Sequence, residues 1–266
     1  MAGTGTWTQA AELDDGGAGN GAQIALANGK VGLGATATVT DGDGDQTTGP
    51  VTADLGGNVR FDDDVPTVSV SAVVDAGVLL TTQDAQTIGA ASDTDSASFA
   101  AAFLAAVTPN YGADGAGTTV VNNYTLTVQD SASGLSSDGV AITLAKVGND
   151  VVGSAGANEV FRISVSAAGT VTLTQSAELD HVGAGNGAQI ALANGKVVLG
   201  ATATVTDVDG DQTTGPVTAD RGGHVRFDDV VPTGSVIAVV DAGLLRTPPG
   251  SHTSGGAWGQ ARGAHA

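Results

Sequence analysis

An internal repeat limits what this chain can fold into more than any other feature. Residues 8–77 (the first copy) recur at residues 174–243 (the second copy), and only ten of the 70 aligned positions differ. Near-identical tandem copies are typical of extended arrays in which each unit contacts its neighbours. The sequence therefore predicts a tandem-repeat protein, and its partners are expected to be neighbouring repeats of the same polypeptide.

The phase of the repeat predicts how the chain is divided. The two copies are offset by 166 residues, so the 266 residues hold one full period. A Phe-Asp-Asp run followed by Val-Pro-Thr marks each junction, because proline ends a strand and adjacent carboxylates stay hydrated. We expect residues 1–65 to be the carboxy-terminal part of a preceding repeat, 66–231 a complete repeat, 232–245 the start of a further repeat, and 246–266 an aberrant, disordered tail.

The composition and the spacing of apolar residues predict an all-β fold. Glycine accounts for 41 residues, and the acids are 25 Asp against 3 Glu, which favours turns over helices. Apolar residues alternate with polar ones at 35–40, 67–74, 123–128 and 161–165, the period of a half-buried strand. Strands at this spacing indicate Ig-like β-sandwich-type tandem repeats.

One segment has a helical period instead. In Ser96–Val107, Phe99, Phe103 and Val107 recur every four residues with alanines between them. This spacing predicts one short amphipathic helix per repeat, capped at its amino end by Asp95 or Ser96.

The charge excludes several classes of partner. The net charge is −19, with 9 Lys and Arg in all, whereas nucleic-acid binding needs clustered basic residues. No apolar run approaches the roughly 18 residues of a membrane span. We therefore expect neither nucleic-acid binding nor membrane insertion.

An acidic pentapeptide is the clearest candidate for a binding site. Asp41, Asp43 and Asp45 alternate with glycine, and the second copy repeats the pattern. In extended chain such side chains share one face, and Ca²⁺ takes 6–8 oxygen ligands. The candidate calcium ligands are Asp41, Asp43, Asp45, Asp62, Asp63, Asp75, Asp207, Asp209, Asp211, Asp228, Asp229 and Asp241.

Two known calcium motifs do not fit this pentapeptide. An EF-hand loop beginning at Asp41 would need glycine and glutamate where Gln46 and Thr52 stand. The nonapeptide β-roll needs Asp where Gly21 closes the run that begins at Gly16. An acidic hairpin turn without metal is the alternative interpretation.

The sequence offers no recognisable catalytic constellation. It has no Gly-x-Ser-x-Gly element, no zinc cluster and no phosphate loop. His181 and His224 each replace a different residue of the first copy, and the other two histidines lie in the tail. We expect this chain not to be an enzyme.

Four segments together resemble the tandem-repeat domain of large type I-secreted, RTX-like bacterial adhesins and surface proteins. They are Val39–Thr48, Val59–Val70, Phe99–Gly117 and Val160–Gln175. The resemblance implies an extracellular or cell-surface location, type I secretion and calcium-dependent rigidity. We expect a structural extender of such an adhesin; the alternative is a carbohydrate- or protein-binding β-sandwich module.

Overall fold

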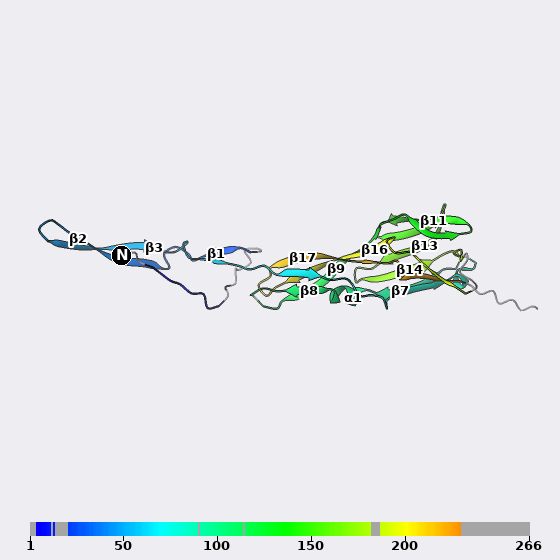
Figure 1. Ribbon diagram of the computed structural model, residues 1–266, viewed down its shortest axis with the longest axis horizontal. Coiled ribbons are helices and arrows are strands. Elements are labelled where there is room, and N and C mark those ends of the chain that lie inside the picture. The colour runs from blue at the N-terminus through cyan, green and yellow to red at the C-terminus, as the bar shows by residue number, and fades with distance from the viewer. Residues whose placement is uncertain are drawn as a thin grey trace, which may run out of the picture. The chain divides into compact units, whose positions relative to one another are not determined.

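The computed structural model describes residues 4–11, 13, 21–89, 91–113, 115–181 and 187–229, and β-strands dominate it (Figure 1). The first copy supplies β1 (Gln23–Ala25), β2 (Gly32–Thr40), β3 (Gln46–Asp54) and β4 (Arg60–Asp62). The second copy supplies β15 (Gln189–Ala191), β16 (Val197–Thr206), β17 (Gln212–Asp220) and β18 (Val225–Asp228). The expected all-β class is confirmed.

The remaining elements lie between β4 and β15; β5 falls at the end of the first copy, and the last two residues of β14 belong to the second. They are β5 (Thr67–Val70), β6 (Leu80–Gln83), the 3-10 helix η1 (Asp84–Thr87), β7 (Asp93–Ser98), α1 (Ala100–Ala105), β8 (Val107–Asn110), β9 (Thr118–Val128), β10 (Ala132–Ser137), β11 (Val140–Val147), β12 (Asp150–Ala155), β13 (Asn158–Val165) and β14 (Thr170–Gln175).

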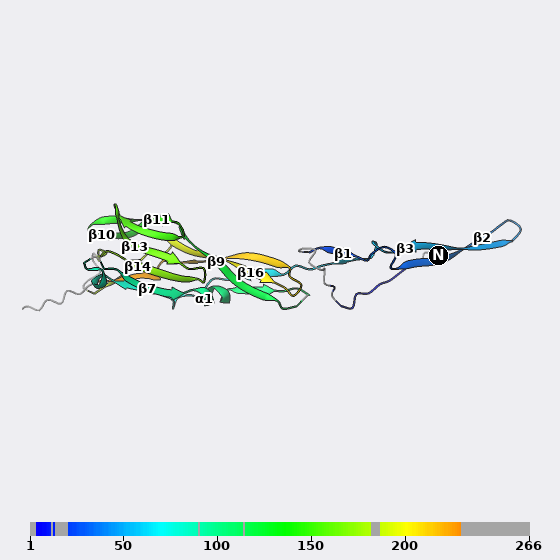
Figure 2. The same ribbon diagram turned by 180° about the vertical axis from the view of Figure 1, so that it is seen from behind.

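Three larger sheets make up this part of the chain, and two of them join the second copy to the segment before it. One has six antiparallel strands in the order β10-β11-β12-β13-β14-β7. In the second, β16 lies between β17 and β9, and both views show β9 beside β16 (Figure 1, Figure 2). In the third, β18 pairs antiparallel with β15 and parallel with β6. The second copy is therefore an integral part of a body that begins near residue 67.

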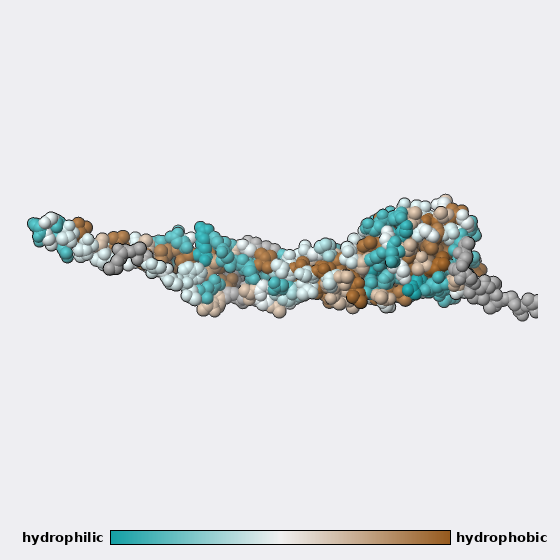
Figure 3. Space-filling view, viewed as in Figure 1, coloured by the Kyte–Doolittle hydropathy of each residue, from teal (hydrophilic) through white to brown (hydrophobic). Residues whose placement is uncertain are grey.

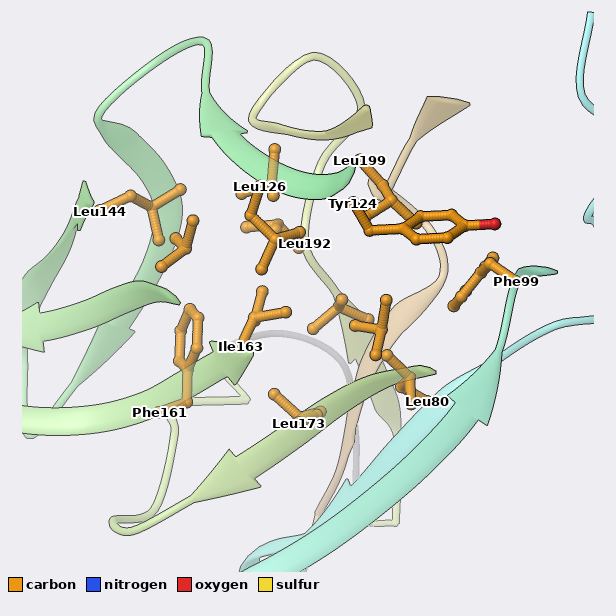
Figure 4. Close-up of a cluster of buried hydrophobic side chains, with 14 of the residues drawn as sticks. Leu80, Phe99, Tyr124, Leu126, Leu144, Phe161, Ile163, Leu173, Leu192 and Leu199 are labelled. Carbon is orange, nitrogen blue, oxygen red and sulfur yellow. The ribbon is translucent and has the colours of Figure 1, made fainter. Parts of the chain in front are cut away.

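The core of this body contains side chains from distant parts of the sequence. Figure 4 shows Leu80, Leu126 and Leu173 pointing toward the same interior as Leu192 and Leu199. All five are fully buried. Fully burying one such side chain contributes roughly 1.5–3 kcal/mol, so residues 67–175 and the second copy stabilise each other.

The first copy has the same strands in a different environment. β2 pairs with β3 in the register that β16 adopts with β17, from Thr40 opposite Gln46 to Gly32 opposite Asp54. Every residue of β2 is nevertheless exposed, whereas buried and half-buried residues alternate along β16. The strand predicted at 35–40 is confirmed, but the half-burial predicted for it is wrong, because alternating burial is found in its second-copy counterpart β16 instead.

The expected helix is present but shorter. Phe99 and Phe103 are both fully buried, as their spacing predicts. The capping prediction is wrong: Asp95 and Ser96 lie in β7, and Phe99 precedes the first helical residue. β7 pairs with β14 along its whole length, and these sheet hydrogen bonds hold the chain extended up to Ser98.

Other strand predictions are confirmed with changed ends. The alternation at 123–128 lies in β9, and that at 161–165 lies in β13. The strand expected over 67–74 stops at Val70, where β5 loses its partner β8. Residues 232–245 and 246–266, and with them Asp241, lie outside the described residues.

Candidate functional site

The acidic pentapeptide of the first copy forms the turn between β2 and β3. Asp41 Oδ1 accepts hydrogen bonds from the amides of Gly44, at 3.1 Å, and Asp45, at 2.9 Å. Gly44 has a φ of +101°, a conformation that glycine adopts at little cost. Oxygen atoms of Asp41, Asp43 and Asp45 lie within 4.8 Å of one another, close enough to share one cation. Interaction with Asp43, and then with backbone amides, lowers the pKa of Asp41.

The same turn is partly buried in the second copy, although Val208 is 66% exposed. Asp207 and Asp211 are 4% and 5% exposed. Asp207 Oδ1 accepts a hydrogen bond from the Gly210 amide at 3.1 Å. In the described part of the chain, no donor reaches Asp207 Oδ2 or either carboxylate oxygen of Asp209. These three oxygen atoms are buried without a donor in the described chain, and the Asp207 and Asp209 side chains also interact with each other.

The first aspartate of the motif has its pKa shifted in opposite directions in the two copies, because it is buried in only one of them. Desolvation, and then interaction with Asp209, raises the pKa of Asp207, whereas the pKa of its counterpart Asp41 is lowered. A cation beside Asp207 and Asp209 would supply the partner that solvent supplies to Asp41 and Asp43. Hard oxygen ligands suit Ca²⁺ or Mg²⁺. Asp211 has a different partner, because its Oδ2 accepts a hydrogen bond from the Gly21 amide at 2.9 Å.

The other predicted ligands do not join these turns in the described structure. Asp62 accepts a hydrogen bond from the Gln23 amide group, and Asp228 accepts one from Gln189 in the second copy. Asp63 is half-buried on the chain that follows β4. Each of these carboxylates lies beside the β1–β4 or β15–β18 pair, away from the hairpin turn of its own copy.

Asp75 has a partner that the sequence did not reveal. Its carboxylate forms an ion pair with the fully buried Arg221, and His224 Nε2 lies 3.6 Å from its other oxygen. The Arg221 guanidinium also lies 4.2 Å from the centre of the Phe99 ring, in cation–π geometry. Burial lowers the pKa of Arg221, while Asp75 opposes that effect. Position 55, the counterpart of Arg221 in the first copy, holds leucine.

A second group of potential ligands contains Asp229, a predicted ligand, and two residues that sequence reasoning missed. Asp84 and His181 lie with Asp229 so that one ligand atom from each falls within 4.8 Å of the others. His181 Nδ1 is 3.4 Å from Asp84 and 3.9 Å from Asp229. The signal available in the sequence was the change from Asp15 to His181 between otherwise matching copies.

The members of this second group also contact neighbouring backbone and side-chain groups. The two ring nitrogens of His181 each lie 3.1 Å from a backbone carbonyl, of Leu179 and of Phe227. Desolvation raises the pKa of Asp84, and the Gln175 side chain, which donates to it, acts against that rise. The cluster therefore links the second copy to η1 through the close contacts of His181 with Asp84 and Asp229.

The comparisons with known proteins identify a family and no activity. The family described as "Domain of unknown function (DUF5801)" matches residues 72–219. No curated protein and no solved structure matches the chain. In the described residues, no helix is long and apolar enough to cross a membrane.

Proposed function

The chain belongs to the DUF5801 family, whose function is unknown, and from this premise we propose that it is a structural extender. Its repeats form a spacer in a large secreted or cell-surface adhesin and hold a distal binding domain away from the cell. We propose that residues 66–231 form one complete unit with Ig-like β-sandwich architecture.

The near-identity of the two copies carries this proposal. The length of a spacer depends on how many equal units it contains, and near-identical units give equal increments of length. β16 and β18 of the second copy pair with β9 and β6, so one period of sequence supplies every strand of these sheets. A unit of one period can therefore be repeated without redesigning its core.

Calcium is part of the proposal because the acidic turns need a counter-charge. Asp207 and Asp209 present buried oxygen atoms without hydrogen-bond donors in the described residues. Asp41, Asp43 and Asp45 present a close group of exposed carboxylates. With a net charge of −19 on the whole chain, bound Ca²⁺ would relieve repulsion within the turns and stiffen the array.

The test is to measure length against the number of units. Chains would carry two, three and four copies of residues 66–231 in tandem, and small-angle scattering would give the maximum dimension of each. We expect a constant increment of at least about 40 Å per unit, the diameter of a compact body of that size. Dimensions that do not grow steadily with unit number would rule out an extender.

The same chains test the alternative of a binding module. A spacer restores the reach of a distal domain in proportion to unit number, whatever sequence its loops carry. A binding module instead retains a carbohydrate or protein target through one loop, and loses it when that loop alone is substituted. If retention of the target depends on one loop and not on the number of units, the chain is a binding module and not a spacer.

A further inference from the structure

The β2–β3 hairpin exposes an apolar face that its duplicate buries. Leu33, Val39 and Val51 are 59%, 64% and 54% exposed. Figure 3 shows hydrophobic residues at the surface of this hairpin. Their counterparts Leu199, Val205 and Val217 are all fully buried. Identical side chains at identical register thus differ only in what covers them.

The second copy shows what the covering elements are. β9 pairs along the free edge of β16, with Leu126 opposite Leu199. β6 pairs in parallel with β18, from Leu80 opposite Val225 to Gln83 opposite Asp228. A Cβ built on Gly215 would lie 2.9 Å from Val68, so β5 closes tightly over β17. These three strands all come from residues 66–173, here named the acceptor segment.

The first copy already has the conformation that this segment receives. Residues 21–62, here named the half unit, repeat the internal hydrogen bonds of the second copy. Gly57 donates its amide hydrogen to Leu26 at 2.6 Å, as Gly223 does to Leu192 at 2.7 Å. A Cβ on Gly56 would approach the backbone to 2.4 Å, and one on Gly222 to 2.3 Å. The half unit is therefore preorganised, and docking requires little rearrangement of its backbone.

We propose that the half unit is a docking surface for a second copy of the acceptor segment. Strands equivalent to β9 and β6 would add to the free edges of β2 and β4, and a β5 equivalent would cover β3. The inference rests on the tandem organisation in the proposed function. Its test, however, measures whether the β2–β3 hairpin becomes covered, and it does not depend on the length of an array.

The differences between the copies predict how selective this docking is. Arg221 contacts Asp75 of the acceptor segment, and His224 Nδ1 lies 2.9 Å from the carbonyl of Val78. The half unit has Leu55 and Asn58 at these positions. Leu55 leaves the aspartate without its cation, so the half unit binds this acceptor segment more weakly than the resident second copy does.

The experiment extends the full chain with the proposed occupant. A second copy of residues 66–172 is placed directly before Trp7, so that Trp7 occupies the position of the buried Leu173. A Trp258→Phe background leaves Trp7 as the one tryptophan. Amide hydrogen exchange of residues 32–54 is measured with and without the extension, together with the emission of Trp7.

We expect the extension to slow exchange of residues 32–54 at least about tenfold and to shift Trp7 emission to shorter wavelength. The matched control carries Leu126→Asp in the added copy alone, which places a charge opposite Leu33, and it should abolish both effects. Leu55→Arg should slow exchange further in the extended chain and leave the unextended chain unchanged. Unchanged exchange on extension, or equal protection by the Leu126→Asp control, would overturn the proposal. The extender function would not be affected by this result, because the scattering measurement tests it separately.

Discussion

Single residues decide how the two copies differ, because three residues special to the second copy, His181, Arg221 and His224, contact the acceptor segment. Arg221 replaces leucine and is buried against Asp75, and His181 replaces aspartate and lies beside Asp84. Each change adds a donor or a positive charge next to a carboxylate of the acceptor segment. The second copy is thus matched electrostatically to the segment that it completes.

The buried ion pair of Arg221 should be costly to break from one side. We expect Arg221→Leu, which installs the residue of the first copy, to lower the free energy of unfolding by about 3–5 kcal/mol, because Asp75 keeps a charge that is only 10% exposed without its partner. Urea unfolding followed by circular dichroism measures this loss.

Adding Asp75→Ala to Arg221→Leu provides the control for that measurement. The double variant should recover a large part of the loss, since no unpaired charge then remains buried. Losses that simply add in the double variant would show that the two side chains contribute independently, against the ion pair.

Calcium should stabilise the chain through the buried turn. Millimolar calcium chloride should raise the melting temperature of the full chain, because a bound ion would contact oxygen atoms of Asp207 and Asp209 that no donor reaches in the described chain. At a hundred times the dissociation constant the gain is about 2.7 kcal/mol, or roughly 5–11 °C for a body of this size. Thermal unfolding with calcium and then with chelator measures it.

The two copies provide a matched pair of variants for this test. Asp209→Asn should remove most of the calcium gain, and without calcium it should cost little, because it removes an unpaired charge. Asp43→Asn makes the same change in the exposed turn and should affect the melting temperature less. Equal gains in the wild type and in Asp209→Asn would mean that the buried turn holds no ion.

At the scale of strands, the sequence predicted which residues alternate but not which strands are covered. β2 and β16 share the run Leu-Gly-Ala-Thr-Ala-Thr-Val-Thr, so no local pattern distinguishes them. Burial depends on β9, which lies far from β16 in the chain. The helix shows the same limit, because pairing of β7 with β14 shortened it from its amino end.

The candidate site was predictable in part for a similar reason. The spacing of Asp41, Asp43 and Asp45 is local, and the structure brings their oxygens together as expected. Asp84 and His181 are nearly a hundred residues apart, and Arg221 meets Asp75 across a still longer stretch. Such contacts follow from the way that the second copy docks on the acceptor segment, which no spacing in the sequence reveals.

Hydrogen exchange can compare β2 and β16 within one molecule. Their shared sequence gives nearly equal intrinsic rates, so any difference reports the covering strands. We expect amides of β2 to exchange at least about a hundredfold faster than the same amides of β16. Peptides that contain Gly42 or Val208 identify the copy in mass spectrometry. Equal rates would mean that the hairpin of the first copy is covered as well.

At the scale of the whole molecule, the hydrophobic core shows which parts of the chain pack together. Leu192, Val197, Leu199, Val225 and Phe227 of the second copy are fully buried with residues of the acceptor segment. The second copy and the acceptor segment therefore share one hydrophobic core. The half unit contributes none of the buried apolar residues of that core in the described chain.

Removing the first copy should therefore affect stability much less than introducing one charge into the core that the second copy completes. A chain that starts at Pro66 should melt within a few degrees of the full chain, because it keeps every residue of the core. A full chain with Leu199→Asp should lose its cooperative transition, because a buried charge without a partner costs several kcal/mol, comparable with the whole stability of a domain. The matched change Leu33→Asp falls on an exposed strand and should shift the melting temperature by little. Thermal unfolding of the three proteins measures these effects, and a large loss on removing residues 1–65 would show that the first copy belongs to the same cooperative unit.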